Sequence, residues 1–166
     1  METLYFDRLG ELRRTKNELE RRLKVSISIE GKKVTINGNA FEEFEALTVL
    51  EAMNFGFSAQ TALMLKDDDT VFRIIPIKNF TRRKDLETVK ARIIGTQGRT
   101  KRTIENLADC QVIVRGNEVG LICPAEEIDY VITGMTNLIR GSKQANVYKF
   151  LEKINAAKKD KDKNKE

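Results

Sequence analysis

The segment RIIGTQGRTKRTIENL, residues 92–107, combines two glycines with a run of positive charge. Gly95 and Gly98 flank a two-residue spacer, and glycine lets a backbone turn sharply without a side chain covering it. The spacing predicts that Arg99 begins a helix whose first turns carry further basic residues. Main-chain N–H groups at a helix N-terminus bind phosphates, and cations around them strengthen that binding. This pattern therefore predicts recognition of a sugar-phosphate backbone.

Positive charge is concentrated around this glycine loop. The whole chain of 166 residues carries a net charge of only +5. The stretch 82–102 carries +6, because Asp85 and Glu87 offset only two of its eight basic residues, which are Arg82, Arg83, Lys84, Lys90, Arg92, Arg99, Lys101 and Arg102. A local concentration of this kind indicates an anionic partner better than the total charge does.

Alternatives to a nucleic-acid site follow from the same residues. A Gly-x-x-Gly alone is a weak signal and is more typical of a helix-to-helix turn than of a binding site. A nucleotide-binding P-loop is excluded, because it needs four residues between the glycines and then Gly-Lys-Ser/Thr. The chain has no histidine, and Cys110 and Cys123 are too far apart for a Cys-x-x-Cys pair, so we interpret both as core thiols. We expect no metal, no cofactor and no enzymatic activity.

An internal repeat appears when the chain is shifted by 85 residues. Gly10 aligns with Gly95 and Glu20 with Glu105, and Arg14-Thr15-Lys16 meets an identical tripeptide at residues 99–101. Farther on, Gly31 aligns with Gly116, and the alternating apolar residues of the two copies stay in register. The sequence therefore predicts two copies of one unit.

Each copy predicts the same local elements. A polar helix precedes the alternating strands VSISIE (25–30) and CQVIVR (110–115), and a tight turn follows each of them, at EGKK in the first copy and Gly116-Asn117 in the second. Short strands are predicted upstream at 3–6 and 71–77. The expected order is strand, helix, glycine turn, helix, strand, strand, helix.

Each copy closes with an amphipathic helix. The predicted apolar positions are Phe41, Phe44, Leu47 and Leu50 in the first copy, and Ile128, Val131, Ile132, Met135, Leu138 and Ile139 in the second. We also expect Tyr5 and Phe6 in the core. With these aromatics buried, strong base stacking is not predicted.

Domain boundaries follow from composition. Residues 54–66 predict a connector helix that ends at Asp67-Asp68-Asp69, so we assign 1–66 to the first domain and 67–152 to the second. The charged segment 153–166 is predicted to be a disordered tail. No apolar run is long enough to cross a membrane, and the start lacks a secretory signal, so we expect a soluble, cytoplasmic, monomeric protein.

The segment IIGTQGRTKRTIENL, placed between two predicted helices and ahead of a β-hairpin, resembles the signature of a KH domain. The predicted element order resembles the type I variant. The resemblance implies an α+β fold with two type I KH domains in tandem, each with a three-stranded sheet packed against three helices. It also implies that the loop clamps a four-nucleotide stretch of single-stranded RNA.

A narrower resemblance covers residues 3 to about 155. The chain is similar to the archaeal and eukaryotic ribosome-assembly family that includes the partner of Nob protein. The similar stretches are GRTKRTIEN (98–106), NFGFSAQTAL (54–63) followed by three aspartates, and NLIRGS with VYKFLE near the end. This similarity implies a single-stranded RNA-binding factor that acts near the 3′ end of small-subunit ribosomal RNA. It also implies, as partners, other assembly factors and, in archaea, the alpha subunit of translation initiation factor two.

The predicted RNA-binding residues lie in the loop, the following helix and the hairpin. They are Ile94, Gly95, Thr96, Gln97, Gly98, Arg99, Thr100, Lys101, Arg102, Ile113 and Arg115. For the basic helix the alternative is a solvated face. For residues 112–114 the alternative is core packing, in which at most one side chain faces the groove and contacts bases. Arg115 is suited to either a base edge or a phosphate.

The first copy departs from the pattern of the family. Arg13 stands where the second copy has Gly98, and Glu11 would repel a phosphate. We expect the first unit to be a packing or protein-binding module, with a weakened RNA site as the alternative. GSKQANVY (141–148) lacks a proline after its serine, which leaves the turn there undefined. Two alternatives remain for the whole chain, a protein-interaction scaffold and a KH regulator of other RNA.

Overall fold

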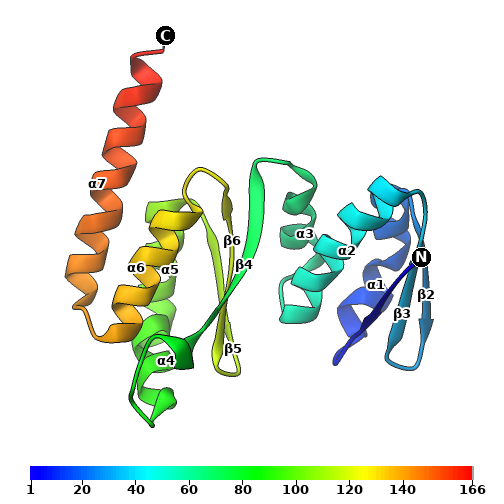
Figure 1. The fold of residues 1–166 in the computed structure, drawn as a ribbon, viewed down its shortest axis with the longest axis horizontal. Helices are drawn as coiled ribbons and strands as arrows, with labels where there is room; N and C mark the ends of the chain where they lie inside the picture. Colours follow the sequence, from blue (N-terminus) through cyan, green and yellow to red (C-terminus); the bar gives the residue numbers. More distant parts are fainter. Residues whose placement is uncertain (166) are drawn as a thin grey trace. The chain divides into compact units, whose positions relative to one another are not determined.

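The computed structural model describes residues 1–165 and divides them into two compact units, of which the first spans Met1–Phe72 and the second begins at Arg73. Each unit contains a three-stranded sheet, and its helices lie on one face of that sheet (Figure 1). The predicted α+β class with three-stranded sheets is therefore confirmed. No helix among these residues has both the length and the apolar character that a membrane span requires.

The first unit orders its strands β1-β3-β2, and both outer strands run antiparallel to β3. Its core contains the buried side chains of Leu12, Leu19, Val34 and Ile36. The elements of this unit are β1 (Glu2–Tyr5), α1 (Gly10–Leu23), β2 (Ser26–Glu30), β3 (Lys33–Asn37), α2 (Ala40–Phe55), α3 (Ala59–Ala62) and the 3-10 helix η1 (Leu63–Lys66).

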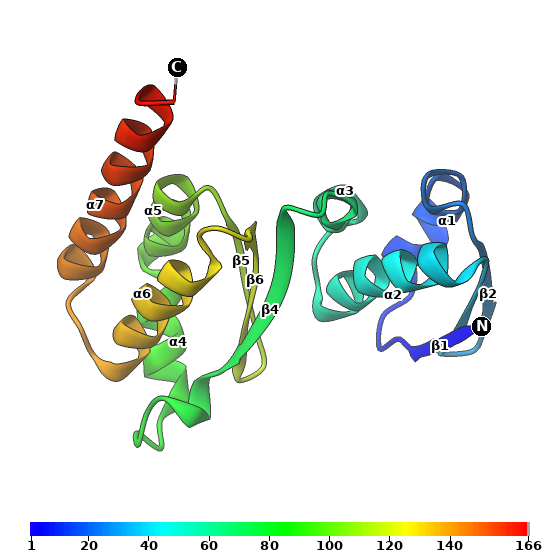
Figure 2. The same cartoon turned by 45° about the horizontal axis from the view of Figure 1, so that its top comes forward.

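The second unit orders its strands β4-β6-β5, and its helices lie on one side of this sheet (Figure 2). Strand β4 contains the boundary between the two units. The elements are β4 (Thr70–Pro76), η2 (Ile77–Asn79), α4 (Leu86–Ile94), η3 (Thr96–Gly98), α5 (Arg99–Ala108), β5 (Gln111–Arg115), β6 (Glu118–Pro124), α6 (Ile128–Arg140) and α7 (Gln144–Lys163).

The turns of the two units repeat at the offset of 85 residues. Lys24 and Asp109 end equivalent helices in the left-handed region, with φ of 58° and 51°. Gly31 and Gly116 open equivalent hairpin turns, with φ of 59° and 57°. Because these conformations are uncommon, and for Lys24 and Asp109 unfavourable, their recurrence supports the repeat independently of residue identity.

A partly buried polar contact repeats at the same offset. The carboxylate of Glu20 accepts a hydrogen bond of 3.0 Å from the main-chain N–H of Ile27, and Glu105 accepts one of 3.1 Å from Val112. In both cases the acid ties the end of a helix to the first residues of the following strand. The two units therefore share a local framework from α1 and α5 onward.

The units differ before this framework. In the second unit α4 and the glycine loop precede α5, whereas residues 6–9 of the first unit connect β1 directly to α1. The predicted helix before the glycine turn is therefore absent from the first unit as described. Four residues are too few to contain both a helix and a turn, and Gly10 itself is helical.

Three aromatic side chains that we expected in the core are exposed. Tyr5, Phe41 and Phe44 each remain 68% accessible, whereas Phe6 is buried. The buried stripe of α2 is centred on Ala46 and Met53. Phe41 and Phe44 lie five and two residues before Ala46, which places them roughly 140 to 160° from it around a helix of 3.6 residues per turn. The corresponding stripe of α6 is mostly buried, as predicted.

The C-terminal segment also differs from expectation. Helix α7 continues to Lys163, whereas we predicted a disordered tail from residue 153. The turn at 141–143 precedes it, and Val147 and Leu151 anchor its first half against Gly134 of α6. Lysine and alanine both favour helix, so charge alone does not end it. Residue 166 of the predicted tail lies outside the described residues.

Candidate nucleic-acid interface

The glycine loop leaves an exposed stretch of main chain between α4 and α5. Helix α4 ends at Ile94, and Gly95 turns the chain with a φ of 77°. Gln97 and Gly98 then adopt φ of 55° and 76°, so the loop forms one tight turn instead of a continuous helix. None of the residues of η3 is buried, and Thr96 and Gln97 are exposed.

The two glycines have different structural roles. A Cβ added to Gly95 would lie 2.6 Å from the main-chain nitrogen of Thr100 and 2.7 Å from its Cβ. At Gly98 the same atom would meet nothing within 4 Å. Gly95 is therefore required by close packing of the loop on α5, whereas Gly98 keeps an open surface free of side chains.

Thr100 supports the loop from below and is not on its surface. It is buried, and its hydroxyl oxygen accepts a hydrogen bond of 3.3 Å from Nε2 of Gln144. The same Nε2 lies 3.4 Å from the carbonyl oxygen of Arg92. Of the predicted site residues, Thr100 is thus placed to hold the loop and not to contact a ligand. Sequence patterns gave no signal for Gln144, because it comes from a helix 44 residues away.

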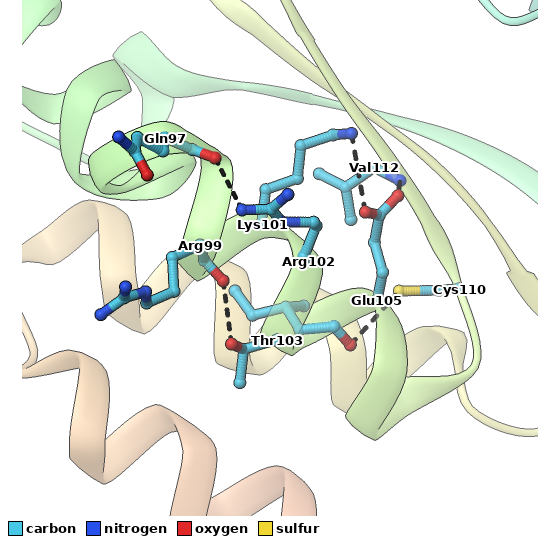
Figure 3. Close-up of polar contacts among 9 residues, drawn as sticks. Gln97, Arg99, Lys101, Arg102, Thr103, Glu105, Cys110 and Val112 are labelled. Carbon is cyan, nitrogen blue, oxygen red and sulfur yellow. Dashed lines mark hydrogen bonds and ion pairs between the residues drawn. The ribbon is translucent and has the colours of Figure 1, made fainter.

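Three cations of α5 lie beside the loop and differ in the groups that they contact (Figure 3). Arg102 donates a hydrogen bond of 2.8 Å to the carbonyl oxygen of Gln97 and so closes the turn. Lys101 lies 3.6 Å from Glu105. Arg99 is exposed, and within residues 1–165 its guanidinium has no hydrogen bond or ion pair. Arg99 is therefore the cation that is most available to a bound anion.

The other predicted residues are spread over two surfaces. Ile94 is 38% exposed at the edge of the loop, next to the fully buried Ile93. Val112 of β5 is buried toward the helices, so the alternation of the strand directs Ile113 to the opposite face of the sheet. The structure does not bring Ile113 to the side of the glycine loop. Arg115 ends β5 and pairs in register with Glu118 across the hairpin turn.

One member of the basic cluster has a structural role. Arg92 donates hydrogen bonds to the carbonyl oxygens of Leu138, at 3.2 Å, and Ser142, at 2.7 Å. These carbonyls lie at the C-terminal end of α6, where the helix leaves its acceptors unpaired. Arg92 therefore fixes α4 against α6 and does not face a ligand.

Comparison with known proteins assigns this arrangement to a family. Residues 71–156 match the model of the eukaryotic type KH domain (KH-domain type I) in its version for the second KH domain of Pno1. The chain belongs to the Pno1 family of KH-domain proteins. It is 30% identical over 152 residues to a KH domain-containing protein of Methanocaldococcus jannaschii, a match that covers 87% of this chain and 67% of that protein.

More distant relatives and solved structures agree with this assignment. The pre-rRNA-processing protein pno1 of Aspergillus fumigatus is 25% identical, and the match covers 78% of this chain and 52% of that protein. The chain thus spans about half the length of this fungal relative. The crystal structure of Dim2p from Pyrococcus horikoshii has a TM-score of 0.83 at 30% identity and covers 92% of this chain and 98% of its own.

A second structure from Pyrococcus horikoshii is that of an a/eIF2alpha-aDim2p-rRNA complex. Its matching chain has a TM-score of 0.84 at 29% identity, with 94% of both chains covered. That crystal structure contains aDim2p together with a/eIF2alpha and rRNA.

The first unit has no equivalent of the exposed loop. Residues 10–13, which align with Gly95–Gly98, form the first turn of α1. Glu11 accepts hydrogen bonds from the main-chain N–H of Ala59, at 3.1 Å, and from the guanidinium of Arg14, at 2.9 Å. The hydrogen bond from Ala59, and then that from Arg14, holds the pKa of Glu11 below its usual value. This segment therefore serves packing within its own unit.

We expect Glu11→Gln to destabilise the first unit in a pH-dependent way. Because folding lowers the pKa of Glu11, its stabilisation is complete above the unfolded pKa of about 4.3 and is lost as the pH falls through the folded pKa. The side chain is 38% exposed, so we expect a loss of only about 0.5 kcal/mol at pH 7 after solvent screening. Urea unfolding at pH 7 and at low pH measures this difference.

The matched control for this experiment is Glu18→Gln. Glu18 lies on the exposed surface of the same helix. Its carboxylate oxygen is 3.8 Å from a guanidinium nitrogen of Arg22, which makes a long, solvent-exposed ion pair. We expect this variant to unfold at the same urea concentration as the parent within error. A Glu11 variant that loses equal stability at both pH values would show that the charge of Glu11 is not the cause.

Proposed function

We propose that this chain is an RNA-binding ribosome-assembly factor whose second unit clamps single-stranded RNA through the Gly95–Gly98 loop. The observation that carries the proposal is the exposed left-handed main chain at Gln97 and Gly98, directly ahead of a basic helix. The proposal includes a tandem arrangement of two KH domains, at 1–66 and 67–152. It also includes binding near the 3′ end of small-subunit ribosomal RNA.

Main-chain donors of the loop support this chemistry. The N–H of Gly98 bonds the carbonyl oxygen of Gly95, and the N–H of Arg99 bonds that of Thr96. Thr96 and Gln97 are exposed and lie in the same turn, directly before the first residue of α5. Main-chain N–H groups at such a helix start can bind phosphate oxygens, and the helix dipole adds to their attraction.

The relatives support the choice of RNA and partners. Fungal relatives are named pre-rRNA-processing proteins, and the similar Pyrococcus chain was solved with ribosomal RNA and a/eIF2alpha. We therefore propose small-subunit ribosomal RNA as the ligand and the alpha subunit of initiation factor two as a protein partner. The first unit, which lacks a glycine loop, serves in this proposal as a packing or protein-binding module.

Salt dependence tests whether phosphates carry the binding. We expect the log of the association constant for single-stranded RNA to fall with the log of salt concentration with a slope of about −2 to −3, if three or four cations each neutralise a phosphate. Fluorescence anisotropy with a labelled 3′-terminal segment of small-subunit ribosomal RNA measures this slope. A flat response would contradict the proposed site.

Crosslinking in cells tests the ribosomal assignment separately from the clamp. The attached RNA is sequenced after ultraviolet crosslinking of the wild-type protein. We expect reads that cluster at the 3′ end of the small-subunit RNA. A cluster on messenger RNA would retain the clamp but overturn the ribosomal assignment.

A further inference from the structure

A basic surface cavity lies in the second unit, apart from the glycine loop. Its volume is about 740 Å³, and its lining comes from the segment between β4 and α4 and from the last residue of α6. The lining residues are Lys78, Asn79, Phe80, Thr81, Arg82, Arg83 and Arg140. Four of them are cations and none is acidic, so the cavity is suited to an anion.

The segment that lines this cavity is held in place at several points. Ile77 is fully buried, and its N–H donates a hydrogen bond of 2.9 Å to the carbonyl oxygen of Asn117. The hydroxyl of Thr81 accepts one of 3.2 Å from the N–H of Arg83. Asp85 then caps α4. Three of the four cations therefore lie on an anchored segment.

Arg140 is positioned by an aromatic ring. Its guanidinium carbon lies 5.5 Å from the centroid of Phe80, a distance at which the face of the ring attracts a cation. A guanidinium held over a ring can still donate its N–H groups to an anion. Among the described residues, no ion pair neutralises Lys78, Arg82, Arg83 or Arg140. Such unneutralised charge stabilises a bound polyanion most strongly at low salt.

Two contacts connect the cavity to the predicted RNA interface. Asn117, which accepts from Ile77, lies in the hairpin turn that follows Arg115. Arg92, three residues before Gly95, binds the carbonyls on either side of Arg140 in sequence, those of Leu138 and Ser142. The end of α6 thus connects the wall of the cavity to the helix that leads into the glycine loop.

We propose that this cavity binds phosphates of the same RNA strand, beyond the nucleotides that the glycine loop holds. The inference rests on the proposed function and extends it. A KH loop alone clamps about four nucleotides. With the cavity engaged, the second unit has a longer footprint, and its affinity increases with RNA length. Sequence composition counted Arg82 and Arg83 with the loop cations, whereas the structure places them in this separate site.

The test compares RNA of two lengths. The probes are labelled single-stranded RNA pools of random sequence, of about five and about twelve nucleotides. We expect the double variant Arg82→Gln/Arg83→Gln to bind the longer RNA roughly 5- to 20-fold more weakly at low salt, with a salt slope shallower by about 1.4 because two phosphate contacts are lost. Its affinity for the shorter RNA stays within about twofold of wild type, because the glycine loop is unchanged.

Arg140→Gln removes the cation that α6 contributes to the cavity, and we expect it to weaken binding of the longer RNA roughly threefold. Lys149→Gln/Lys153→Gln is the matched control, because it removes two exposed α7 cations that do not line the cavity. We expect this control to bind both RNAs as wild type does. Arg140 is the last residue of α6, whereas none of the other substituted positions is at the end of a helix. Circular dichroism checks that each variant is folded.

The outcomes separate this inference from the proposed function. If the Arg82/Arg83 variant matches wild type, or weakens both RNAs equally, the cavity does not extend the footprint and the inference is wrong. A control that weakens the longer RNA as much as the cavity variant does would also overturn it. If wild type fails to bind even the shorter RNA, the proposed function fails as well.

Discussion

Replacing Thr96 and Gln97 by aspartate is expected to weaken the binding of single-stranded RNA by about 30- to 100-fold at low salt. The change places two negative charges beside the phosphates that the loop amides would bind, and like charges in close contact cost several kcal/mol. Both side chains are exposed, so the fold does not depend on them. Anisotropy titration with the five-nucleotide pool measures the loss.

The backbone of the loop also accepts this change. Gln97 has a φ of 55°, a left-handed conformation that aspartate and asparagine adopt more readily than most residues. The matched control is Thr96→Asn/Gln97→Asn, which has nearly the same shape as the aspartate variant without its charge. We expect the asparagine variant to remain within about threefold of wild type. Unchanged affinity in the aspartate variant would favour a protein-interaction scaffold over an RNA clamp.

The second large effect is expected from Gly95→Ala, which should destabilise the second unit by about 2 to 4 kcal/mol. Gly95 has a φ of 77° and a ψ of 172°, where a non-glycine residue costs roughly 1 to 3 kcal/mol, and the clash with the main chain of Thr100 adds to that cost. Because α5 must move to relieve the clash, we expect weaker RNA binding as well. Hydrogen exchange of peptides from 86–108, with urea unfolding, locates and measures the loss.

Gly98→Ala provides the comparison. Gly98 has nearly the same φ as Gly95, but its ψ of 14° is left-handed helical, whereas the ψ of 172° at Gly95 lies in a region that essentially only glycine occupies. At Gly98 the added methyl group meets open space, so only the conformational cost of about 1 kcal/mol remains. Its effect on RNA should exceed its effect on stability, since the methyl group stands on the surface proposed to meet the strand. Equal destabilisation by both variants would contradict the packing role of Gly95.

Local features of the chain were predictable because they depend on neighbours in sequence. The glycine spacing predicted a sharp turn ahead of a basic helix, and that turn is present at Gln97 and Gly98. Alternating apolar residues predicted both hairpins, with turns at Gly31 and Gly116. The offset of 85 predicted a repeat, which the shared contacts of Glu20 and Glu105 reproduce. Backbone preference and side-chain period act over a few residues, so a sequence expresses them directly.

Other features were decided by contacts between distant segments. Gln144 reaches Thr100 beneath the loop, and Arg92 binds the end of α6, so neither role was visible in the local pattern. Phe41 and Phe44 are exposed because the sheet selects the face of α2 that contains Ala46. Helix α7 continues through a charged segment that composition predicted to be disordered.

The same division applies to the candidate sites. By itself the sequence determined the exposed glycine loop and its nearby cations, because a Gly-x-x-Gly between helices constrains its own backbone. Only the tertiary structure decided which cations are available, since it pairs Arg92 with carbonyls and leaves Arg99 free within the described residues. It also brought Arg140 beside Arg82 in one cavity. Charges 58 positions apart become neighbours only when helices pack on a common sheet.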